Sequence, residues 1–245
     1  MRPWGTSVYR VTPRSAGVAF AGLGLVLIPA VFARQLIRKK QPGSGAAVNW
    51  FDRRAIGQES QVAEWVSNVG TILGIATPFA IDWFDTHGEQ DAFREDALVI
   101  GQALALSGAL NTAAKYIVQR PLPETYAGVV PNRRGKPRGY RAFYSGHVAS
   151  LATSLAAGCI TVRRRHGRLP WRWPWVSSAA LTGLVAVGRI LSGKHFPSDV
   201  LVGAPVGATI GAAVPLLHAR QGRHRRAWAR LNRKRRWRAA VRRVL

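Results

Sequence analysis

The stretch AVGRILSGKHFPSDVLVG, residues 185–202, places an Arg, a Lys, a His and an Asp between two apolar runs. Charged side chains are costly at a membrane, so those found there often serve a function. The flanking runs, 173–188 and 200–217, contain no Asp, Glu, Lys or Arg. The stretch therefore predicts a short loop that joins two membrane helices and carries chemistry.

Other parts of the chain repeat the same alternation of apolar runs and basic loops. Four more stretches lack all four charged residue types, namely 15–33, 65–81, 97–114 and 142–162. A helix that spans a membrane needs roughly 17–25 apolar residues, so these stretches are short but sufficient. A soluble bundle would show polar faces on its surface helices, which these runs lack. The sequence predicts an all-α, polytopic membrane bundle with about six transmembrane helices.

Three parts are expected along the chain. Residues 1–64 form an N-terminal transmembrane helix and an outside amphipathic helix, in the segment VNWFDRRAIGQESQVAEW. Residues 65–217 form the catalytic membrane domain, and residues 218–245 form a polybasic cytoplasmic tail. The first apolar stretch also fits a cleavable signal peptide, which remains an alternative.

The chain is strongly basic, with a formal net charge of +25. In a soluble protein this charge would suggest nucleic-acid binding. Because 47% of the residues are hydrophobic and are gathered in blocks, the sequence disfavours nucleic acid as a partner. Each basic residue of the tail is instead expected to add about 1 kcal/mol of attraction to anionic lipid head groups, although the tail also fits a plain solvated flank.

Metal and disulfide chemistry find little support in the composition. Cys159 is the only cysteine, so the chain has no internal disulfide and no Cys/His zinc pattern. It lies in an apolar run and is expected to fill the core. The few acidic residues form no carboxylate cluster suited to a metal. We therefore expect neither a metal nor a cofactor.

A bundle of six spans with both chain ends inside brings distant residues to one face. Residues 1–14, 82–96, 163–172 and 218–245 would lie inside, and they carry more Lys and Arg than the outside segments 34–64, 115–147 and 189–199. The positive-inside rule favours this orientation. The outside face then gathers a set of polar residues: Lys115, Arg120, Ser145, Gly146, His147, Arg189, His195 and Asp199.

This set of residues is suited to binding a phosphate group. Lys and Arg bind anions, and Arg matches phosphate oxygens with two donors. The Ser-Gly-His at a helix start adds backbone N–H groups and the positive end of the helix dipole. Two histidines could divide the roles of nucleophile and general acid–base, and Asp199 could orient His195. Any one such residue alone is usually inert, because interfacial Arg and Lys often extend to head groups.

These residues resemble the three motifs of the type 2 phosphatidic acid phosphatase (PAP2) and vanadium-dependent haloperoxidase superfamily. The family's Ser-Arg-x5-His-x3-Asp is present as Gly188-Arg189-ILSGK-His195-FPS-Asp199, and Pro-Ser-Gly-His as Tyr144-Ser145-Gly146-His147. The first motif, Lys-x6-Arg-Pro, keeps Lys115 and Pro123 but has Leu122 in place of Arg. The resemblance covers roughly residues 65–217, and the order of apolar blocks is similar to that of the family's six-helix membrane members.

The resemblance implies a metal-independent bacterial lipid phosphatase of the inner (plasma) membrane, with its active site on the outer, periplasmic face. His195 would attack phosphorus to give a phosphohistidine, Asp199 would orient His195, and His147 would act as acid and then base. The phosphate would be held by Lys115, Arg189, Ser145 and Gly146, with Arg120 or Arg141 in place of the missing Arg. Substrates would be phosphatidic acid, phosphatidylglycerol phosphate, a polyprenyl diphosphate or a lipid A phosphate.

Leu122 keeps open a second interpretation. Loss of a cation at the oxyanion site can cost on the order of 10²–10³ in rate. The chain could then be a catalytically weak relative that binds lipid phosphate or anchors a partner through its tail. A haloperoxidase is disfavoured, because those relatives are soluble. The oligomeric state is not predicted.

Overall fold

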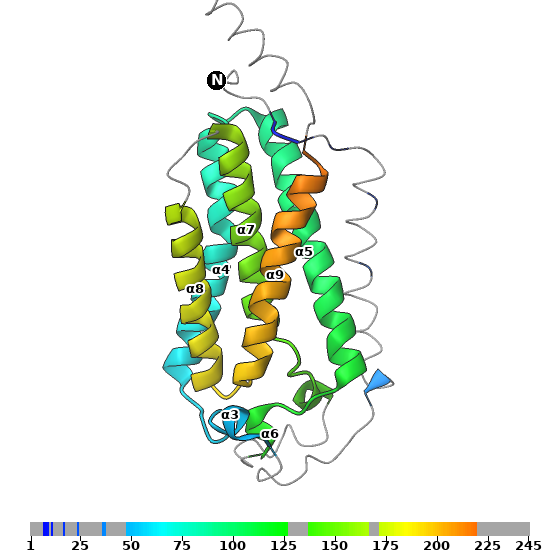
Figure 1. Ribbon diagram of the computed structural model, residues 1–245, viewed down its shortest axis with the longest axis vertical. Coiled ribbons are helices and arrows are strands. Elements are labelled where there is room, and N and C mark those ends of the chain that lie inside the picture. The colour runs from blue at the N-terminus through cyan, green and yellow to red at the C-terminus, as the bar shows by residue number, and fades with distance from the viewer. Residues whose placement is uncertain are drawn as a thin grey trace, which may run out of the picture.

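A computed structural model describes residues 48–126, 137–166 and 172–219, together with positions 7–9, 11, 17, 24, 36 and 37. Its long helices run side by side along one axis (Figure 1): α4 (Gln61–Asp85), α5 (Gln90–Val118), α7 (Gly146–His166), α8 (Arg172–Leu191) and α9 (Pro197–Leu217). The short helices α3 (Trp50–Arg53) and α6 (Pro123–Tyr126) and the 3₁₀ turn η3 (Pro137–Tyr140) complete the described elements. The predicted all-α class is confirmed for this part of the chain.

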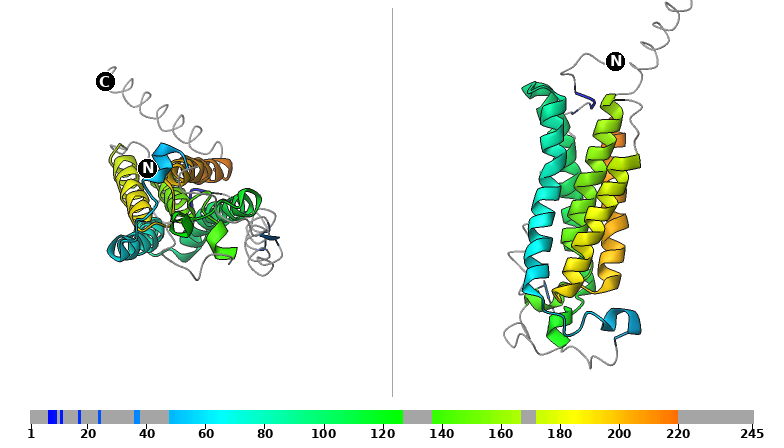
Figure 2. Two further views of the ribbon diagram at one scale, coloured as in Figure 1. Left: turned by 90° about the horizontal axis from the view of Figure 1, so that it is seen from below. Right: turned by 90° about the vertical axis from the view of Figure 1, so that its left-hand side faces the viewer.

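Helix α7 is the centre of the bundle. It packs against α4, α5, α8 and α9, and α9 is its most extensive neighbour (Figures 1 and 2). Its buried positions run almost without a break from Val148 to Thr161 and are mostly Ala, Ser, Thr and Gly. Because α7 contacts protein on nearly every side, it needs small residues for close packing rather than long apolar ones for lipid.

Three segments of the described residues are long and apolar enough to cross a membrane: Gln90–Tyr126, Arg172–Leu191 and Pro197–Leu217. The prediction of a membrane bundle is confirmed to this extent, with fewer candidate spans than the six expected. Helices α4 and α7 coincide with two further predicted stretches but are not among these three segments; α4 carries Glu64, Asp82 and Asp85 near its ends, and α7 is the buried centre. The predicted span 15–33 and the tail beyond residue 219 lie outside the described residues.

The amphipathic helix predicted over residues 48–65 is not one continuous helix in the structure. Helix α3 has four residues and is capped by Asn49, whose side chain accepts the Asp52 N–H. Gly57 then adopts a φ of +85°, a left-handed conformation that ends helical structure and favours glycine. The next helix starts afresh at Gln61, where Ser60 caps it by accepting the Ala63 N–H at 3.2 Å.

The end of the bundle opposite α3 contains a buried ionic cluster. Arg165 of α7 bonds to Asp82 of α4 at 2.7 Å and also to Asp96 of α5. Asp96 in turn accepts the Val8 N–H at 3.2 Å, and the hydroxyl of the fully buried Tyr9 lies 2.8 Å from Thr161 Oγ1. Described residues of three segments predicted to share the inside, 1–14, 82–96 and 163–172, therefore meet at one end of the bundle.

These contacts predict that residues 7–9 stay attached to the mature protein. Their removal would take the Ser7 hydroxyl and the Val8 N–H from the Asp96 carboxylate and the Tyr9 hydroxyl from Thr161, and the loss of buried hydrogen bonds is costly. Intact-mass measurement of the protein purified from membranes is expected to include residues 7–9. A mature chain that begins after residue 33 would instead support the signal-peptide alternative.

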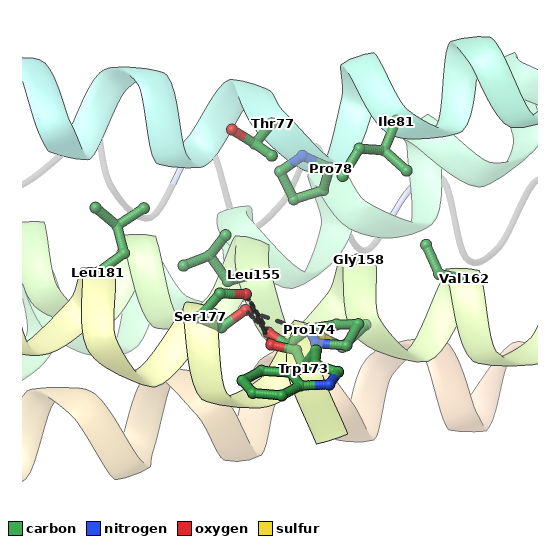
Figure 3. A pocket seen from close by; sticks show the side chains of 12 residues that line it. Thr77, Pro78, Ile81, Leu155, Gly158, Val162, Trp173, Pro174, Ser177 and Leu181 are labelled. Carbon is green, nitrogen blue, oxygen red and sulfur yellow. Dashed lines mark hydrogen bonds between the residues drawn. The ribbon is translucent and has the colours of Figure 1, made fainter. Parts of the chain in front are cut away.

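An apolar groove of about 530 Å³ opens between α4 and α8 (Figure 3). Pro78 and Ile81 line one side, Trp173 and Leu181 the other, and Gly158 of α7 lies at its floor. None of the residues predicted to act on phosphate lines it. Its apolar lining suits contact with lipid chains, at a distance from the polar end of the bundle.

Candidate active site

The polar end of the bundle assembles the predicted residues from four helix ends. The C-terminal end of α5, the N-terminal ends of α7 and α9, and the C-terminal end of α8 meet there, next to α3 and α6 (Figures 1 and 2). Electrostatic interactions link their side chains. Lys115, Arg189 and Asp199 all act on His195, and Lys115, Arg189 and His195 all act on His147. The structure thus brings together residues that lie up to 84 positions apart, from Lys115 to Asp199.

The geometry of His195 fixes its tautomer. Its Nδ1 lies 2.9 Å from the backbone oxygen of Ala142. Because a carbonyl oxygen only accepts hydrogen bonds, Nδ1 must carry the proton. The lone pair is therefore on Nε2, which is the atom that a nucleophilic imidazole would use.

The surroundings of His195 favour its neutral form. Burial lowers the pKa of His195, which is 4% exposed, and the positive charges of Lys115 and Arg189 lower it further. Asp199 acts in the opposite direction and does not outweigh these effects. A neutral ring at neutral pH is what nucleophilic attack on phosphorus requires.

Asp199 lies beside His195 but does not bond to it as expected. Its Oδ2 is 3.7 Å from His195 Nδ1, which is an ion-pair distance rather than a hydrogen bond. The same Oδ2 accepts the Phe196 N–H at 2.9 Å, at the start of α9. The ring is instead oriented by Ala142, because the chain before α7 passes closer to Nδ1 than the carboxylate does. Pro197 and Ser198 are the first two residues of α9.

Lys115 and the start of α7 are packed very closely. A Cβ on Gly146 would lie 3.4 Å from Lys115 Nζ and 2.8 Å from Asn111 Oδ1. Glycine is therefore the residue that lets the first turn of α7 approach these side chains. Asn111 lies one turn before Lys115 on α5 and donates to the Tyr144 oxygen at 2.7 Å. It holds the loop that leads into Ser145.

Two polar groups of the site are buried without a hydrogen-bond partner among the described residues. They are the Ser145 hydroxyl, on a residue that is 0% exposed, and Arg189 Nε, on a residue that is 6% exposed. Another part of the Arg189 guanidinium, Nη1, donates to Asn68 Oδ1 at 2.9 Å. Buried polar groups nearly always have partners in folded proteins, so a ligand is the expected partner here.

Arg120 was predicted to bind phosphate, but in the structure it binds two carboxylates. Its guanidinium bonds to Asp199 at 2.6 Å and to Asp52 at 2.7 Å, and it lies over the Phe196 ring. Leu122, at the position of the family's Arg, packs in an apolar cluster with Ala55, Ala142 and Phe196. The side chain at 122 thus fills the core of this end, and Arg120 binds carboxylates.

Lys194 and Gly188 also differ from what the motif suggests. Lys194 is paired with Glu124 at 3.2 Å and Glu64 at 3.3 Å, so it anchors the loop rather than facing a substrate. A Cβ at Gly188 would lie 2.9 Å from the Ser67 Cβ on α4. The family's Ser at this position would therefore clash with α4 as it is packed here.

The sequence alone did not single out Asp52, Asn68 and Asn111. Asn111 precedes Lys115 by four residues, and this spacing on a helix could have placed it on the same face. Asp52 and Asn68 lie in α3 and α4, far in sequence from their partners, and no local pattern marks them. Among the described residues, no three His, Cys, Asp or Glu side chains are grouped to hold a metal ion.

Comparison with known proteins shows the family of the chain. The model of the PAP2 superfamily matches residues 96–223, and the chain belongs to this family. The chain is 27% identical over 148 residues to a lipid A 1-phosphatase of Porphyromonas gingivalis, a match that covers 60% of this chain and 29% of the relative. It is 34% identical over 121 residues to a decaprenylphosphoryl-5-phosphoribose phosphatase of Mycobacterium tuberculosis, covering 49% of this chain and 60% of the relative.

The chain thus spans less than two thirds of the length of either relative. No solved structure matches it significantly. The family assignment covers the helices that build the polar end, α5, α7, α8 and α9. Helix α4, which supplies Asn68, and helix α3, which supplies Asp52, precede the matched region.

Proposed function

We propose that this protein is an integral membrane lipid phosphatase, which hydrolyses a phosphomonoester or diphosphate of a lipid through a phosphohistidine intermediate. One observation carries the proposal. His195 has its Nδ1 proton bound to Ala142 and its Nε2 lone pair free for attack, beside Lys115 and Arg189. Membership of the PAP2 superfamily and the similarity to two bacterial lipid phosphatases support it.

The reaction would proceed in two displacements. In the first, His195 Nε2 attacks phosphorus, the bond from phosphorus to the leaving oxygen breaks, and His147 protonates that oxygen. In the second, the now neutral His147 takes a proton from water, the water oxygen attacks phosphorus, and the P–N bond breaks. Inorganic phosphate leaves, the electron pair returns to Nε2, and His147 is protonated again.

The phosphate oxygens would be held by positively charged side chains and by hydrogen-bond donors at the polar end of the bundle. Lys115 and Arg189 supply positive charge, Ser145 Oγ supplies a hydroxyl, and the first turn of α7 supplies N–H groups at Gly146. Arg120 is bonded to two carboxylates, so Arg141 is the better candidate to replace the family's Arg, in whose place this chain has Leu122. Its charge acts on Lys115, and its Nη1 lies 3.4 Å from the Tyr116 hydroxyl.

A lipid substrate is supported by a second apolar groove, of about 390 Å³, between α8 and α9. It is lined by Ala186 and Val200, which lie three residues before Arg189 and directly after Asp199. Ala204 and Leu201 continue the groove away from the polar end. A lipid chain lying there would have its phosphate close to His195.

We further propose the finer arrangement in the membrane. Six spans, the polar end on the outer face of the inner membrane, and a basic tail on anionic lipids are compatible with the two ends of the described bundle. The positive-inside rule would then account for the basic residues of the opposite end. Reaction of single engineered cysteines with an impermeant reagent in intact cells would test which end faces outward.

The proposal is tested by phosphate release from detergent-purified protein with EDTA present. The panel is phosphatidic acid, phosphatidylglycerol phosphate, a polyprenyl diphosphate and a lipid A phosphate, with glycerol 3-phosphate as the chain-free comparison. We expect at least one lipid to release phosphate in the presence of EDTA. This release should exceed that from glycerol 3-phosphate. No release from any lipid would overturn the proposal. It would favour a protein that only binds lipid phosphate, an alternative supported by Leu122, which stands where the family has an Arg.

The depressed pKa of His195 predicts the acid side of the pH profile. A lowered pKa means that the ring stays neutral below the ordinary histidine value of about 6.5. Activity is therefore expected to persist from pH 7 to below that value and to fall only on further acidification. The check is kcat/KM against pH with one lipid substrate, and an acid limb centred above about 6.5 would contradict a buried, neutral nucleophile.

Replacing Arg141 by Ala is expected to weaken substrate binding. A hydrogen bond to a charged group contributes about 1.5 kcal/mol, so KM should rise by about tenfold while kcat changes little. The matched control is Arg94→Ala, because Arg94 is an exposed Arg on α5 at the opposite end, 3.9 Å from Asp91. Equal KM values for the two variants would mean that Arg141 does not contact the phosphate.

A further inference from the structure

We propose that Asp52 and Arg120 are positioning residues, which hold Asp199 and the first turn of α9, and through them His195, in the geometry that catalysis needs. This inference rests on the proposed phosphatase function. It assigns Arg120 a role other than phosphate binding and gives α3, which precedes the region matched by the family model, a part in the active site.

The guanidinium of Arg120 donates its hydrogen bonds to other side chains of the protein. Nη1 donates to Asp199 Oδ1 at 2.6 Å and to Ser198 Oγ at 2.7 Å, and Nη2 donates to Asp52 Oδ2 at 2.7 Å. The flat face of the group lies 4.1 Å from the centre of the Phe196 ring. Phosphate could approach Nη1 or Nη2 only by breaking bonds to two nearly inaccessible carboxylates, which would leave them unpaired at a high cost.

Asp52 is the fixed end of this network. Its side chain is 1% exposed and accepts hydrogen bonds from the Ser198 N–H at 2.9 Å, the Ser198 hydroxyl at 2.8 Å and Asn49 Nδ2 at 2.9 Å, besides Arg120. Burial would raise the pKa of Asp52, but these hydrogen bonds outweigh it and keep the pKa below its ordinary value. Asp52 is thus a charged side chain whose hydrogen bonds connect α3 to the start of α9.

The network ends at His195 through Asp199. Oδ1 of Asp199 is held by Arg120 and Oδ2 by the Phe196 N–H, so the carboxylate cannot turn toward the ring. The charged and titratable groups that face His195 are Lys115 from α5, His147 from α7, Arg189 from α8 and Asp199 from α9. Arg120 neutralises Asp199, the one carboxylate among them. Without Arg120, that carboxylate would draw a proton onto the imidazole and remove the free lone pair.

The matched control is at the opposite end of the bundle. Asp82 is also a nearly inaccessible carboxylate, 2% exposed, and is paired with an arginine, Arg165, at 2.7 Å. An Asp82→Asn change alters a buried carboxylate that is paired with an arginine, as Asp52→Asn does, but at the end of the bundle away from His195. Any loss of function that comes only from weakened packing should appear in this variant as well.

The experiment measures kcat, KM and the pH profile of Asp52→Asn, Arg120→Gln, the double variant and Asp82→Asn. Each of the first two is expected to lose about 10–100-fold in kcat, as supporting residues do, with KM within about threefold. Arg120→Gln should also move the acid limb to higher pH by about one unit, because Asp199 is no longer neutralised. The double variant should be no slower than Arg120→Gln alone, since both changes act on one carboxylate. Asp82→Asn should keep the wild-type kcat and acid limb.

Other results would overturn the inference. A tenfold or larger rise in KM for Arg120→Gln, with an unmoved acid limb and a normal Asp52→Asn, would make Arg120 a phosphate ligand. Equal losses in Asp52→Asn and Asp82→Asn would indicate a purely structural pair. If Asp52→Asn does not fold, Ser198→Ala removes only the hydroxyl between the two residues, and it should lower kcat in the same direction without raising KM.

Failure of the proposed function is distinguishable from failure of this inference. If the wild-type protein releases no phosphate, the function fails, and the network is tested by the pKa of the His195 imidazole from proton NMR in detergent. That pKa should rise in Arg120→Gln relative to wild type and stay unchanged in Asp82→Asn. An unchanged value in Arg120→Gln would overturn the positioning role whatever the protein's activity.

Discussion

Replacement of His195 by Gln is expected to lower phosphate release from lipid phosphates by at least about 10⁴-fold, as the loss of a covalent nucleophile does in other hydrolases. Glutamine is close in size and polarity, so it disturbs the buried site little. It offers no nucleophilic nitrogen, because its side chain ends in an amide. The reaction would then depend on water alone, without the phosphohistidine intermediate. Phosphate release per protein under saturating substrate gives the measurement.

The matched control for this change is His218→Gln. His218 caps the other end of α9 and also places its Nδ1 2.9 Å from a backbone oxygen, that of Val214. The control should keep wild-type activity, which would show that loss of a carbonyl-bound histidine is harmless elsewhere. More than a few per cent of activity in His195→Gln would mean that another group attacks phosphorus.

A His147→Ala variant separates the two displacements. With an aryl phosphate, whose leaving group needs no protonation, His195 should still be phosphorylated, while hydrolysis of the intermediate is slowed because no base activates water. Phosphoprotein that is stable to alkali and labile to acid is expected to accumulate in this variant and to be absent from a His147→Ala, His195→Gln double variant. Accumulation in the double variant would place the phosphoryl group on another residue.

The helices were predictable because charge marks their ends. The charge-free runs 65–81, 97–114, 173–188 and 200–217 lie within α4, α5, α8 and α9, and the run 142–162 overlaps α7. The close spacing of Arg189, His195 and Asp199 was also visible, since they lie at the end of α8, in the loop after it and in the first turn of α9. Features that depend on a single local segment can be recognised from the sequence.

The partners of those residues could not be predicted, because they come from distant segments. Arg120 lies within the first motif, between Lys115 and Pro123, and was therefore predicted to bind phosphate. Its actual partners, Asp52 and Asp199, are 68 and 79 residues away. The same holds for the tautomer of His195, which depends on Ala142, 53 residues earlier. Sequence patterns identify the reactive groups, and the fold decides which of them are held and which are free.

The contact of α7 with α9 gives the prediction with the largest effect on folding. A Cβ on Gly207 would lie 2.2 Å from the Ala149 oxygen and 2.9 Å from the Ala149 Cα, and one on Gly211 would lie 2.2 Å from the Thr153 oxygen. These are backbone atoms of the central helix, which cannot move aside as a flexible side chain can. Glycines four residues apart on one face are what permits two helices to approach this closely in a membrane.

Gly207→Ala is therefore expected to destabilise the bundle by more than about 4 kcal/mol, which is exceptional for a single methyl group. The separation of α7 from α9 would also break the 3.1 Å bond from the Ser145 N–H to the Asp199 oxygen, so activity should be lost with the fold. Gly101→Ala is the control, because a Cβ at Gly101 on α5 meets nothing within 4 Å and should be neutral or slightly stabilising. Thermal unfolding in detergent and the yield of monodisperse protein give the comparison, and equal melting temperatures would show that the two backbones are not in contact at Gly207.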